Sequence, residues 1–240
     1  MKTRLDRLMV ERGLAESREK AQALIMAGEV LVGGQKAVKP GQAVAADVAV
    51  EVRSRPPFVS RGGFKLAAAL AHFHIAVVGK VCLDVGASTG GFTDALLQAG
   101  AARVHCVDVG SGQLDWKLRT DPRVVVHDRI NARELTFEDI GELAALAVCD
   151  VSFISVTLVL PALVPLVAPA GEMVILVKPQ FEAGRGQVGK GGIVRDPAVH
   201  RAACDRVAGA VRQFGFAADI MESPILGAEG NKEFLLHARH

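Results

Sequence analysis

The chain has 240 residues, half of them hydrophobic and only 5% aromatic, which is enough apolar material for a core built from aliphatic side chains. The net charge of +2 is uneven: residues 1–65 carry +5 and residues 66–240 carry −3, so we expect the N-terminal part to meet phosphate groups. The four cysteines form no CxxC pair, which argues against a disulfide framework or a metal site and favours buried free thiols in a reducing compartment. The N-terminus shows no apolar signal segment, so we expect a cytoplasmic protein.

Two helices and a small sheet are predicted for the first fifty residues. Apolar residues at helical spacing predict a helix over 4–12. Ser17 is placed to cap a second helix over 18–27. Strand-like residues follow at 30–32 and at 47–52.

This N-terminal part resembles the S4 RNA-binding domain. The resemblance is carried by the patterns Arg4-Leu-Asp-Arg7-Leu, Ser17-Arg18-Glu-Lys20-Ala and Gly28-Glu-Val-Leu-Val-Gly-Gly. It implies that the second helix and the start of the hairpin present basic groups to structured RNA, mainly as phosphate contacts that position the RNA without reading its sequence. The residues that could do so are Arg4, Arg7, Arg18, Lys20 and Lys36. The alternative is a small helical cap with surface arginines.

The chain is expected to form an N-terminal domain over residues 1–55, a linker over 56–63 and a second domain over 64–240. A Pro-Pro pair and Gly62-Gly63 mark the linker. From residue 64 helices alternate with strands, which predicts a parallel sheet with helices on both faces. Helices are expected over 64–73, 92–99, 155–167 and 197–214, and strands over 80–85, 104–109, 124–127, 147–150, 173–177, 216–222 and 233–238. The last two strands have no helix between them, so we expect the final strand to run antiparallel.

Residues 151–171 carry no charge, and this stretch is long enough to be considered as a membrane span. It contains Pro161, Pro165 and Pro169 and runs from one strand-like segment towards another. We therefore expect a strand end and a buried helix instead of a membrane span.

A glycine-rich loop, Asp84-Val-Gly-Ala-Ser-Thr-Gly-Gly-Phe-Thr, follows a strand and opens a helix. Its glycines allow the backbone to turn tightly against a ligand, next to the amides of the helix N-terminus. A dinucleotide fingerprint would need glycine where Ser88 stands. The loop looks instead like the S-adenosylmethionine loop of class I methyltransferases. This resemblance implies a Rossmann-like fold with a mostly parallel seven-stranded sheet, and S-adenosylmethionine as the cofactor.

The acids that end the next two strands complete the expected cofactor site. Asp108 could accept both ribose hydroxyls. Asp128 could meet the adenine amino group, although an ordinary turn residue explains it equally well. The candidate cofactor-binding residues are Asp84, Gly86, Ala87, Ser88, Thr89, Gly90, Gly91, Phe92, Asp108 and Asp128.

Four further motifs extend the resemblance to essentially the whole chain. They are Val59-Ser-Arg-Gly-Gly-Phe-Lys-Leu, Cys149-Asp-Val-Ser-Phe-Ile-Ser, Val177-Lys-Pro-Gln-Phe-Glu and Gly230-Asn-Lys-Glu-Phe-Leu. With the S4-like part and the glycine-rich loop, they resemble the TlyA family, whose members often carry a haemolysin label. The resemblance implies ribose 2′-O-methylation of cytidine in ribosomal RNA, with ribosomal RNA or ribosomal subunits as partners. It also implies an FtsJ-type catalytic tetrad at Lys65, Asp150, Lys178 and Glu233.

The expected topology supports this tetrad independently. Asp150 and Lys178 each follow a parallel strand, at the carboxyl edge where doubly wound sheets bind ligands, and Glu233 begins the antiparallel strand at the same edge. A ribose hydroxyl must lose its proton as it attacks the methyl group, so we expect Lys178 to act as the base. Lys65 would assist it and orient the hydroxyl, while the two carboxylates would hold the two ammonium groups. The chemistry requires no metal, and no His/Cys/Asp cluster with ligand spacing appears, so we expect no metal site. The alternative is that these four residues form ordinary ion pairs at the surface.

Two other functions are kept open by the sequence. One is a membrane-lysing protein of haemolysin type, which would need an exposed amphipathic or spanning segment. The other is a non-catalytic RNA-binding or ribosome-assembly factor that merely retains a cofactor pocket.

Overall fold

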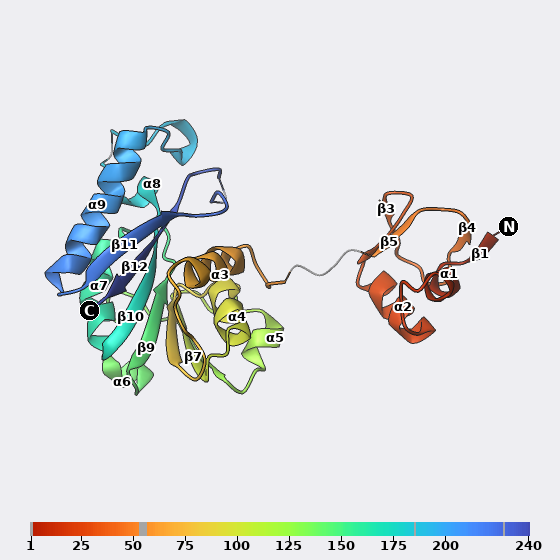
Figure 1. The fold of residues 1–240 in the computed structure, drawn as a ribbon, viewed down its shortest axis with the longest axis horizontal. Coiled ribbons are helices and arrows are strands. Elements are labelled where there is room, and N and C mark those ends of the chain that lie inside the picture. Colours follow the sequence, from red (N-terminus) through yellow and green to blue (C-terminus); the bar gives the residue numbers. More distant parts are fainter. Residues whose placement is uncertain (1, 53–56, 185, 228) are drawn as a thin grey trace. The chain divides into compact units, whose positions relative to one another are not determined.

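The chain forms two compact units, residues 1–57 and 58–240, in a computed structural model that describes residues 2–52, 57–184, 186–227 and 229–240 (Figure 1). Residues 53–55 of the predicted N-terminal domain and residue 56 of the predicted linker lie outside the described residues. The limits proposed for the two domains and the linker therefore stay predictions.

The N-terminal unit packs two helices on short strands. The helices are α1 (Leu5–Glu11) and α2 (Arg18–Met26), close to the predicted ranges, and Ser17 Oγ caps α2 by accepting a 3.2 Å hydrogen bond from the Lys20 amide. The strands are β1 (Lys2–Arg4), β2 (Val30–Val32), β3 (Gln35–Lys36), β4 (Ala43–Ala45) and β5 (Val50–Val52). β1 pairs with β4, and β2 lies between β3 and β5. A core of aliphatic side chains from both helices and from β2 and β4 holds the unit together.

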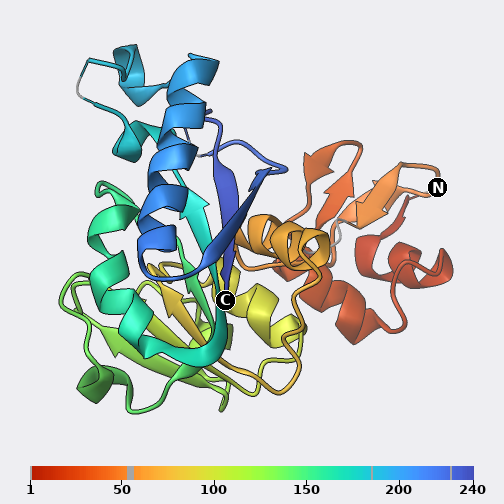
Figure 2. The same ribbon diagram turned by 60° about the vertical axis from the view of Figure 1, so that its left-hand side comes forward.

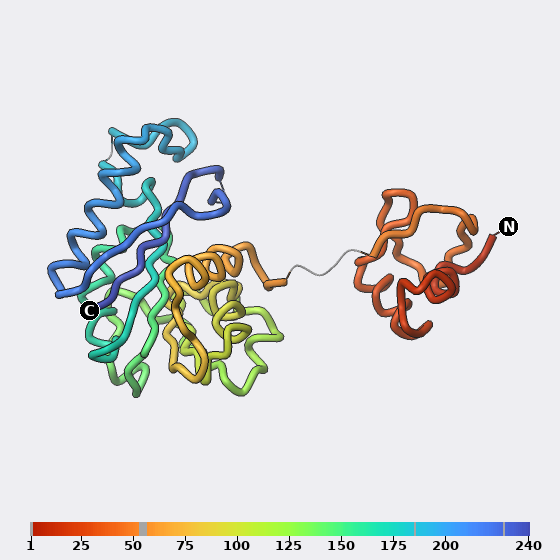
Figure 3. The backbone as a smooth tube through the Cα atoms, in the orientation of Figure 1, coloured from red at the N-terminus to blue at the C-terminus, as the bar shows by residue number. Residues whose placement is uncertain are grey.

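The C-terminal unit is built on a seven-stranded sheet in the order β11-β12-β10-β9-β6-β7-β8. Its strands are β6 (Val81–Val85), β7 (Arg103–Asp108), β8 (Val124–Asp128), β9 (Ala144–Cys149), β10 (Val167–Val177), β11 (Ala217–Glu222) and β12 (Phe234–Arg239). β12 pairs antiparallel with both β10 and β11, and the remaining pairs are parallel. The expected Rossmann-like sheet with an antiparallel final strand is confirmed. The trace in Figure 3 shows this last, blue segment running back to the C-terminus at the left-hand side of the unit.

Helices cover both faces of the sheet. The main ones are α3 (Gly62–His72), α4 (Gly91–Gln98) and α9 (Pro197–Gln213), with α3 and α4 on one face and α9 on the other (Figures 1 and 2). Successive residues of one strand face opposite sides, so Val174 of β10 joins the core under α3 and α4 while Ile175 joins the core under α9. The two cores therefore bury both faces of the sheet.

The helix predicted over residues 155–167 is wrong as a continuous element. The structure breaks it into η1 (Val156–Leu158), α7 (Leu160–Leu163) and η2 (Val164–Leu166), after which β10 begins. Pro161 and Pro165 explain the breaks, because proline lacks the amide hydrogen that a continuous helix needs. The pieces are nevertheless buried against the sheet, as expected for core. Within the described ranges, no helix combines the length and apolarity needed to cross a membrane.

Four short helical turns were not predicted. They are α5 (Trp116–Arg119), α6 (Phe137–Ile140), α8 (Pro179–Glu182) and η3 (Lys190–Gly192). Each has at most four residues, so none can show the repeating apolar pattern on which a helix prediction rests. α8 matters for function because it directly follows the end of β10.

Candidate active site

The carboxyl edge of the sheet gathers the predicted catalytic residues. β9 and β10 are parallel neighbours, and Asp150 and Lys178 follow them directly. β12 runs the other way, and its first residue, Phe234, pairs with Val177 at the end of β10, which brings Glu233 to the same edge. The backbone at Asp150, Lys178 and Glu233 therefore lies at one edge of the sheet, as the sequence predicts.

Lys178 is held by two partners. Its Nζ lies 2.6 Å from Asp150 Oδ1 and donates a 2.7 Å hydrogen bond to Ser152 Oγ. The contact with Asp150 is an ion pair without hydrogen-bond alignment, since Asp150 Oδ1 has no hydrogen-bond partner. The ring of Phe181 lies 6.0 Å from the same nitrogen, at the limit of a cation–π contact. The side-chain nitrogen of Lys178 is thus buried and fixed in position, as a proton acceptor requires once it is a neutral amine.

Lys65 and Glu233 form a second, more deeply buried ion pair. Lys65 Nζ donates to Glu233 Oε2, and the exposed fractions of the two side chains are 10% and 4%. The pair joins α3 to the residue before β12, 168 positions apart in the chain. Ordinary surface ion pairs among these four residues, the alternative interpretation, would be exposed, so burial favours a functional role.

Two hollows open beside these pairs, and Lys65 lines both. The larger, of about 390 Å³, is lined by Lys65, Ser152, Phe153, Lys178, Gln180, Phe181, Val188, Gly192, Glu229 and Glu233. The smaller, of about 130 Å³, is lined by Ser60, Gly62, Lys65, Gly86, Ala87, Ser88, Thr89, Gly91, Phe92 and Asp150. The tetrad therefore lies between the glycine-rich loop and a second space in which a substrate could bind.

The larger hollow has features that the sequence analysis did not single out. Phe153 is 91% exposed, adopts a φ of +65°, and its ring centre lies 5.3 Å from that of Phe181. A left-handed conformation is strained for such a residue and is often found at functional sites. Gln180 Oε1 is buried without a hydrogen-bond partner. All three residues lie in the motifs that follow Cys149 and Val177, so these motifs were the available signal.

The glycine-rich loop has the close approaches that its glycines predict. A Cβ on Gly86, whose φ is +84°, would lie 2.4 Å from the Asp150 carbonyl oxygen, and one on Gly91 would lie 2.2 Å from Ser60 Oγ. Gly90 is also left-handed, with a φ of +95°. Ser88, which stands where a dinucleotide loop would have glycine, has a φ of +48°. The loop therefore lies against both Asp150 and the start of α3.

The three acids expected at the cofactor occupy different settings. The Asp84 carboxyl is fully buried and accepts a 2.6 Å hydrogen bond from Thr93 Oγ1, and burial raises its pKa to about 7. Asp108 accepts from the amides of Ser88, at 2.8 Å, and Gly110, at 2.7 Å. Asp84 thus connects β6 to α4, on the two sides of the loop, through Thr93, and Asp108 connects the loop to the end of β7 through the Ser88 amide.

Asp128 ends β8 and is engaged by its neighbours. It pairs with Arg119 at 2.9 Å and accepts a 3.2 Å hydrogen bond from the Gly112 amide, and the guanidinium lowers its pKa. Neither Asp84, Gly90, Asp108 nor Asp128 lines the smaller hollow, so the structure brings together only part of the predicted set.

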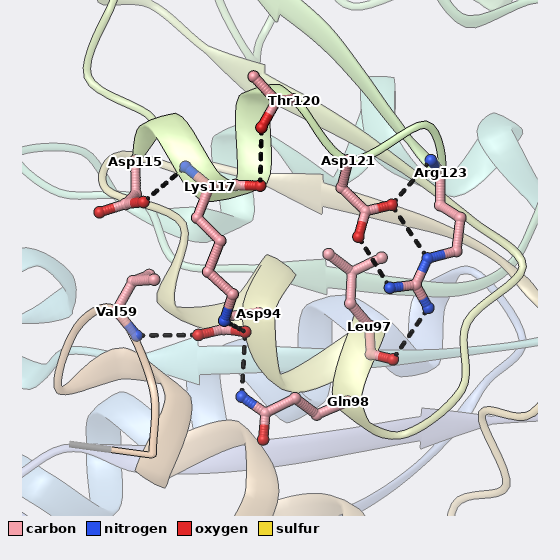
Figure 4. Close-up of polar contacts among 9 residues, drawn as sticks. All are labelled: Val59, Asp94, Leu97, Gln98, Asp115, Lys117, Thr120, Asp121 and Arg123. Atoms are coloured by element: carbon pink, nitrogen blue, oxygen red, sulfur yellow. Dashed lines mark hydrogen bonds and ion pairs between the residues drawn. The ribbon is translucent and has the colours of Figure 1, made fainter. Parts of the chain in front are cut away.

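Asp94 on α4 fixes the surroundings of the loop (Figure 4). This buried carboxylate accepts from the Val59 amide at 2.9 Å and from Gln98 Nε2 at 3.0 Å, and it lies 3.5 Å from Lys117 Nζ. It therefore links the segment before α3, the helix after the loop, and α5. Since Lys65 is on α3, these contacts also hold that lysine in place.

The five basic residues predicted to bind RNA have unequal settings in the N-terminal unit. Arg4 and Arg18 both reach the buried Asp6, at 2.8 and 3.3 Å. Arg7 forms an exposed pair with Glu11 at 3.2 Å. Lys20 is exposed, and the Lys36 side chain passes over Gly28, where a Cβ would lie 1.9 Å from Lys36 Cε.

All four cysteines are free and buried, as expected. In the described part of the chain, no group of three or more His, Cys, Asp or Glu side chains is arranged to hold a metal ion.

Comparison with known proteins assigns both units to families. The FtsJ-like methyltransferase family matches residues 58–240, and the S4 domain family matches residues 3–50. The chain is 50% identical to the 16S/23S rRNA (cytidine-2′-O)-methyltransferase TlyA of Mycobacterium tuberculosis, over 99% of this chain and 90% of the relative. It is 43% identical to Hemolysin A of Brachyspira hyodysenteriae, over 98% of each chain.

A solved structure agrees with these assignments. A Streptococcus thermophilus protein that carries a haemolysin label superposes with a TM-score of 0.75 at 44% identity, covering 99% of this chain and 88% of that one. Identities of this size over nearly the whole length extend beyond a shared fold. The chain is a member of the TlyA family, in which an S4 domain precedes an FtsJ-like methyltransferase domain.

Proposed function

We propose that the protein transfers a methyl group from S-adenosylmethionine to the ribose 2′-hydroxyl of a cytidine in ribosomal RNA. The observation that carries this proposal is the pairing of Lys178 with Asp150 beside the buried Lys65–Glu233 pair, between the glycine-rich loop and the larger hollow. The activity named for the M. tuberculosis relative supports the choice of ribosomal RNA and cytidine. It also supports a cytoplasmic location, where ribosomes are found.

The residues of the glycine-rich loop fit S-adenosylmethionine. Gly86 and Gly91 leave room where side chains would collide with Asp150 or Ser60, and Ala87, Ser88, Thr89 and Phe92 line the smaller hollow. Asp108, at the end of β7, has the position from which an acid accepts ribose hydroxyls. The sulfonium of the bound cofactor supplies an activated methyl group.

In the reacting state Lys178 would be a neutral amine, its own proton having passed to solvent, and it would accept the proton of the 2′-hydroxyl. A hydroxyl is a poor nucleophile until a base within hydrogen-bond reach takes its proton. Asp150 and Ser152 fix Lys178 Nζ and stabilise the ammonium that forms. Lys65, held by Glu233 and lining both hollows, would orient the hydroxyl. Because methyl transfer is an in-line displacement, much of the rate increase would come from this orientation.

The larger hollow would hold the nucleotide. Phe153 and Phe181 offer aromatic faces on which a base can stack, and such stacking on aromatic side chains contributes about 1–3 kcal/mol per base in single-stranded nucleic acids. The unpartnered acceptor of Gln180 would be satisfied by a donor of the bound RNA. The N-terminal unit would add phosphate contacts through its basic residues.

The test is methyl transfer from radiolabelled S-adenosylmethionine to separated ribosomal subunits and to protein-free ribosomal RNA, all from cells that lack this activity. We expect label at an alkali-resistant linkage, and loss of the label with Lys178→Ala. The matched control is Lys80→Ala, which removes another part-buried lysine, 3.3 Å from Glu172 and just before β6. Absence of label in every RNA, with the cofactor bound in calorimetry, would contradict the proposal.

A further inference from the structure

The N-terminal unit contains a buried carboxylate that two of its exposed arginines share. Asp6 is fully buried at the start of α1. Its Oδ1 accepts from Arg4 Nε at 3.0 Å, and its Oδ2 accepts from Arg4 Nη2 at 2.8 Å, Arg18 Nη2 at 3.3 Å and Gln22 Nε2 at 2.9 Å. The donors come from the end of β1 and from two successive turns of α2, so one side chain joins both elements.

The two arginines differ from Asp6 in exposure. The side chains of Arg4 and Arg18 are 51% and 53% exposed. Because both Nη2 atoms bond to the same oxygen, they lie no more than about 6 Å apart. Two cations this close would repel each other without the carboxylate between them. Asp6 therefore allows two guanidinium groups to lie side by side at the surface.

Each arginine keeps donors for a ligand. Arg4 uses one edge of its guanidinium, Nε and Nη2, on Asp6, and Nη1 lies over Gly41, where a Cβ would come within 3.2 Å. Within the described residues, Arg18 donates through Nη2 alone. A guanidinium carries five N–H groups in a rigid fork, so both arginines retain hydrogen bonds to offer. A single phosphate group can accept from both.

We propose that Asp6 is a positioning residue that sets Arg4 and Arg18 as a pair for one phosphate of the RNA backbone. The inference rests on the proposed function, because it needs RNA as the ligand of this unit. Asp6 itself touches no RNA. It fixes the direction of two guanidinium groups that would otherwise sample many rotamers. The side-chain entropy is therefore lost when the protein folds and does not weaken RNA binding.

The positioning role of Asp6 and simple electrostatics predict opposite changes in RNA affinity when this residue is replaced. Replacing Asp6 by asparagine removes a negative charge beside a phosphate site, and electrostatics alone would tighten RNA binding. Loss of positioning would weaken it. We therefore expect Asp6→Asn to raise the Kd for protein-free ribosomal RNA on the order of tenfold and to make the log–log salt dependence shallower by about one unit, as for one lost phosphate contact.

The matched control is Glu11→Gln. It removes the same charge from the same helix, but Glu11 is exposed, and its ion-pair partner in the described part of the chain is the exposed Arg7. We expect it to leave the Kd unchanged or to lower it. Titrations of the full chain between about 50 and 200 mM salt measure both variants. A Kd for Asp6→Asn that equals or falls below that of Glu11→Gln would overturn the inference.

A charge-conserving pair of variants covers the case in which Asp6→Asn does not fold. Arg18→Lys keeps the charge but replaces the rigid, planar fork by a single nitrogen on a flexible chain, whose donors have no fixed direction towards a phosphate. Arg7→Lys makes the same change at an arginine that, among the described residues, forms its ion pair with the exposed Glu11. We expect Arg18→Lys to weaken RNA binding about fivefold more than Arg7→Lys, with circular dichroism unchanged in both. Equal effects would overturn the inference.

The failure of this inference can be told from the failure of the proposed function. If the unmodified protein binds and methylates RNA while the Asp6 and Arg18 variants behave like their controls, only the positioning role of Asp6 is wrong. If the unmodified protein neither binds nor methylates ribosomal RNA, both fail.

Discussion

Replacing Lys65 by methionine leaves the Glu233 carboxylate buried without its partner. Both ends of the pair are at least nine-tenths buried, so water cannot take the place of the missing ammonium. Breaking a buried ion pair by removing one partner costs about 3–5 kcal/mol, whereas replacing both partners by neutral groups is often close to neutral. For a unit of this size the single substitution is expected to lower Tm by about 6–20 °C.

A double-mutant cycle separates the pair from the rest of the core. We expect Lys65→Met and Glu233→Gln each to destabilise the catalytic unit, and the double variant to recover most of the loss, with a coupling energy above about 2 kcal/mol. All three variants should lose methyl transfer, so recovery of stability without activity would distinguish the pair's structural role from its chemical one.

The chain offers a convenient probe for this cycle. Trp116 is the only tryptophan, and it lies in α5 of the catalytic unit. Its fluorescence anisotropy during urea unfolding therefore reports on this unit alone. Additive effects, with a coupling energy below about 0.5 kcal/mol, would refute the reasoning, because they would mean that the two side chains do not interact.

Three further predictions concern the loop and the larger hollow. Burial raises the pKa of Asp84 to about 7, so the folded protein holds a proton that the unfolded chain releases, and stability falls as pH rises towards 7. Urea titrations between about pH 5 and 8 should show that Asp84→Asn removes about 2–3 kcal/mol of this loss of stability. An unchanged pH dependence in the variant would contradict this prediction. Gly86→Ala places a Cβ 2.4 Å from the Asp150 carbonyl oxygen and should weaken cofactor binding more than tenfold in calorimetry. Gly112→Ala is the control, because Gly112 is also left-handed, at φ +70°, but a Cβ there would have nothing within 4 Å. Equal losses of affinity in the two variants would contradict a close fit of the loop against Asp150. Phe153→Gly should stabilise the unit by about 1 kcal/mol by relieving a left-handed backbone, yet raise KM for RNA, and an unchanged KM would exclude the stacking role.

Much of the sheet could be predicted because its signals are local. Each strand is a short apolar run. Asp150 and Lys178 follow such runs and Glu233 precedes one that runs the opposite way, so topology alone brings these three candidate residues to one edge. The antiparallel final strand followed from the lack of a helix after residue 222. The S4 and FtsJ-like assignments followed from motifs that extend through both units.

What could not be predicted depends on packing in three dimensions. The sequence placed two carboxylates near two ammonium groups but did not say which pairs form; the structure joins Lys65 to Glu233 and Lys178 to Asp150. The hydrogen bond that Ser152 accepts from Lys178 was not predicted, because a serine two residues after an acid forms no distinctive sequence pattern. The broken helix after Ser155 shows that apolar composition reports burial and leaves the backbone path open when prolines intervene.

The distance in sequence between Lys65 and Glu233 also sets when the enzyme can begin to work. A ribosome adding about 5–20 residues per second needs on the order of 10–30 s to pass from one member of the pair to the other. Until then the edge of β10 that pairs with β12 is unpaired, and the nascent chain lacks the Lys65–Glu233 ion pair. Since the proposed mechanism needs this ion pair, we expect a growing copy of the protein to leave the RNA of its own ribosome unmethylated at least until Glu233 and β12 have been made.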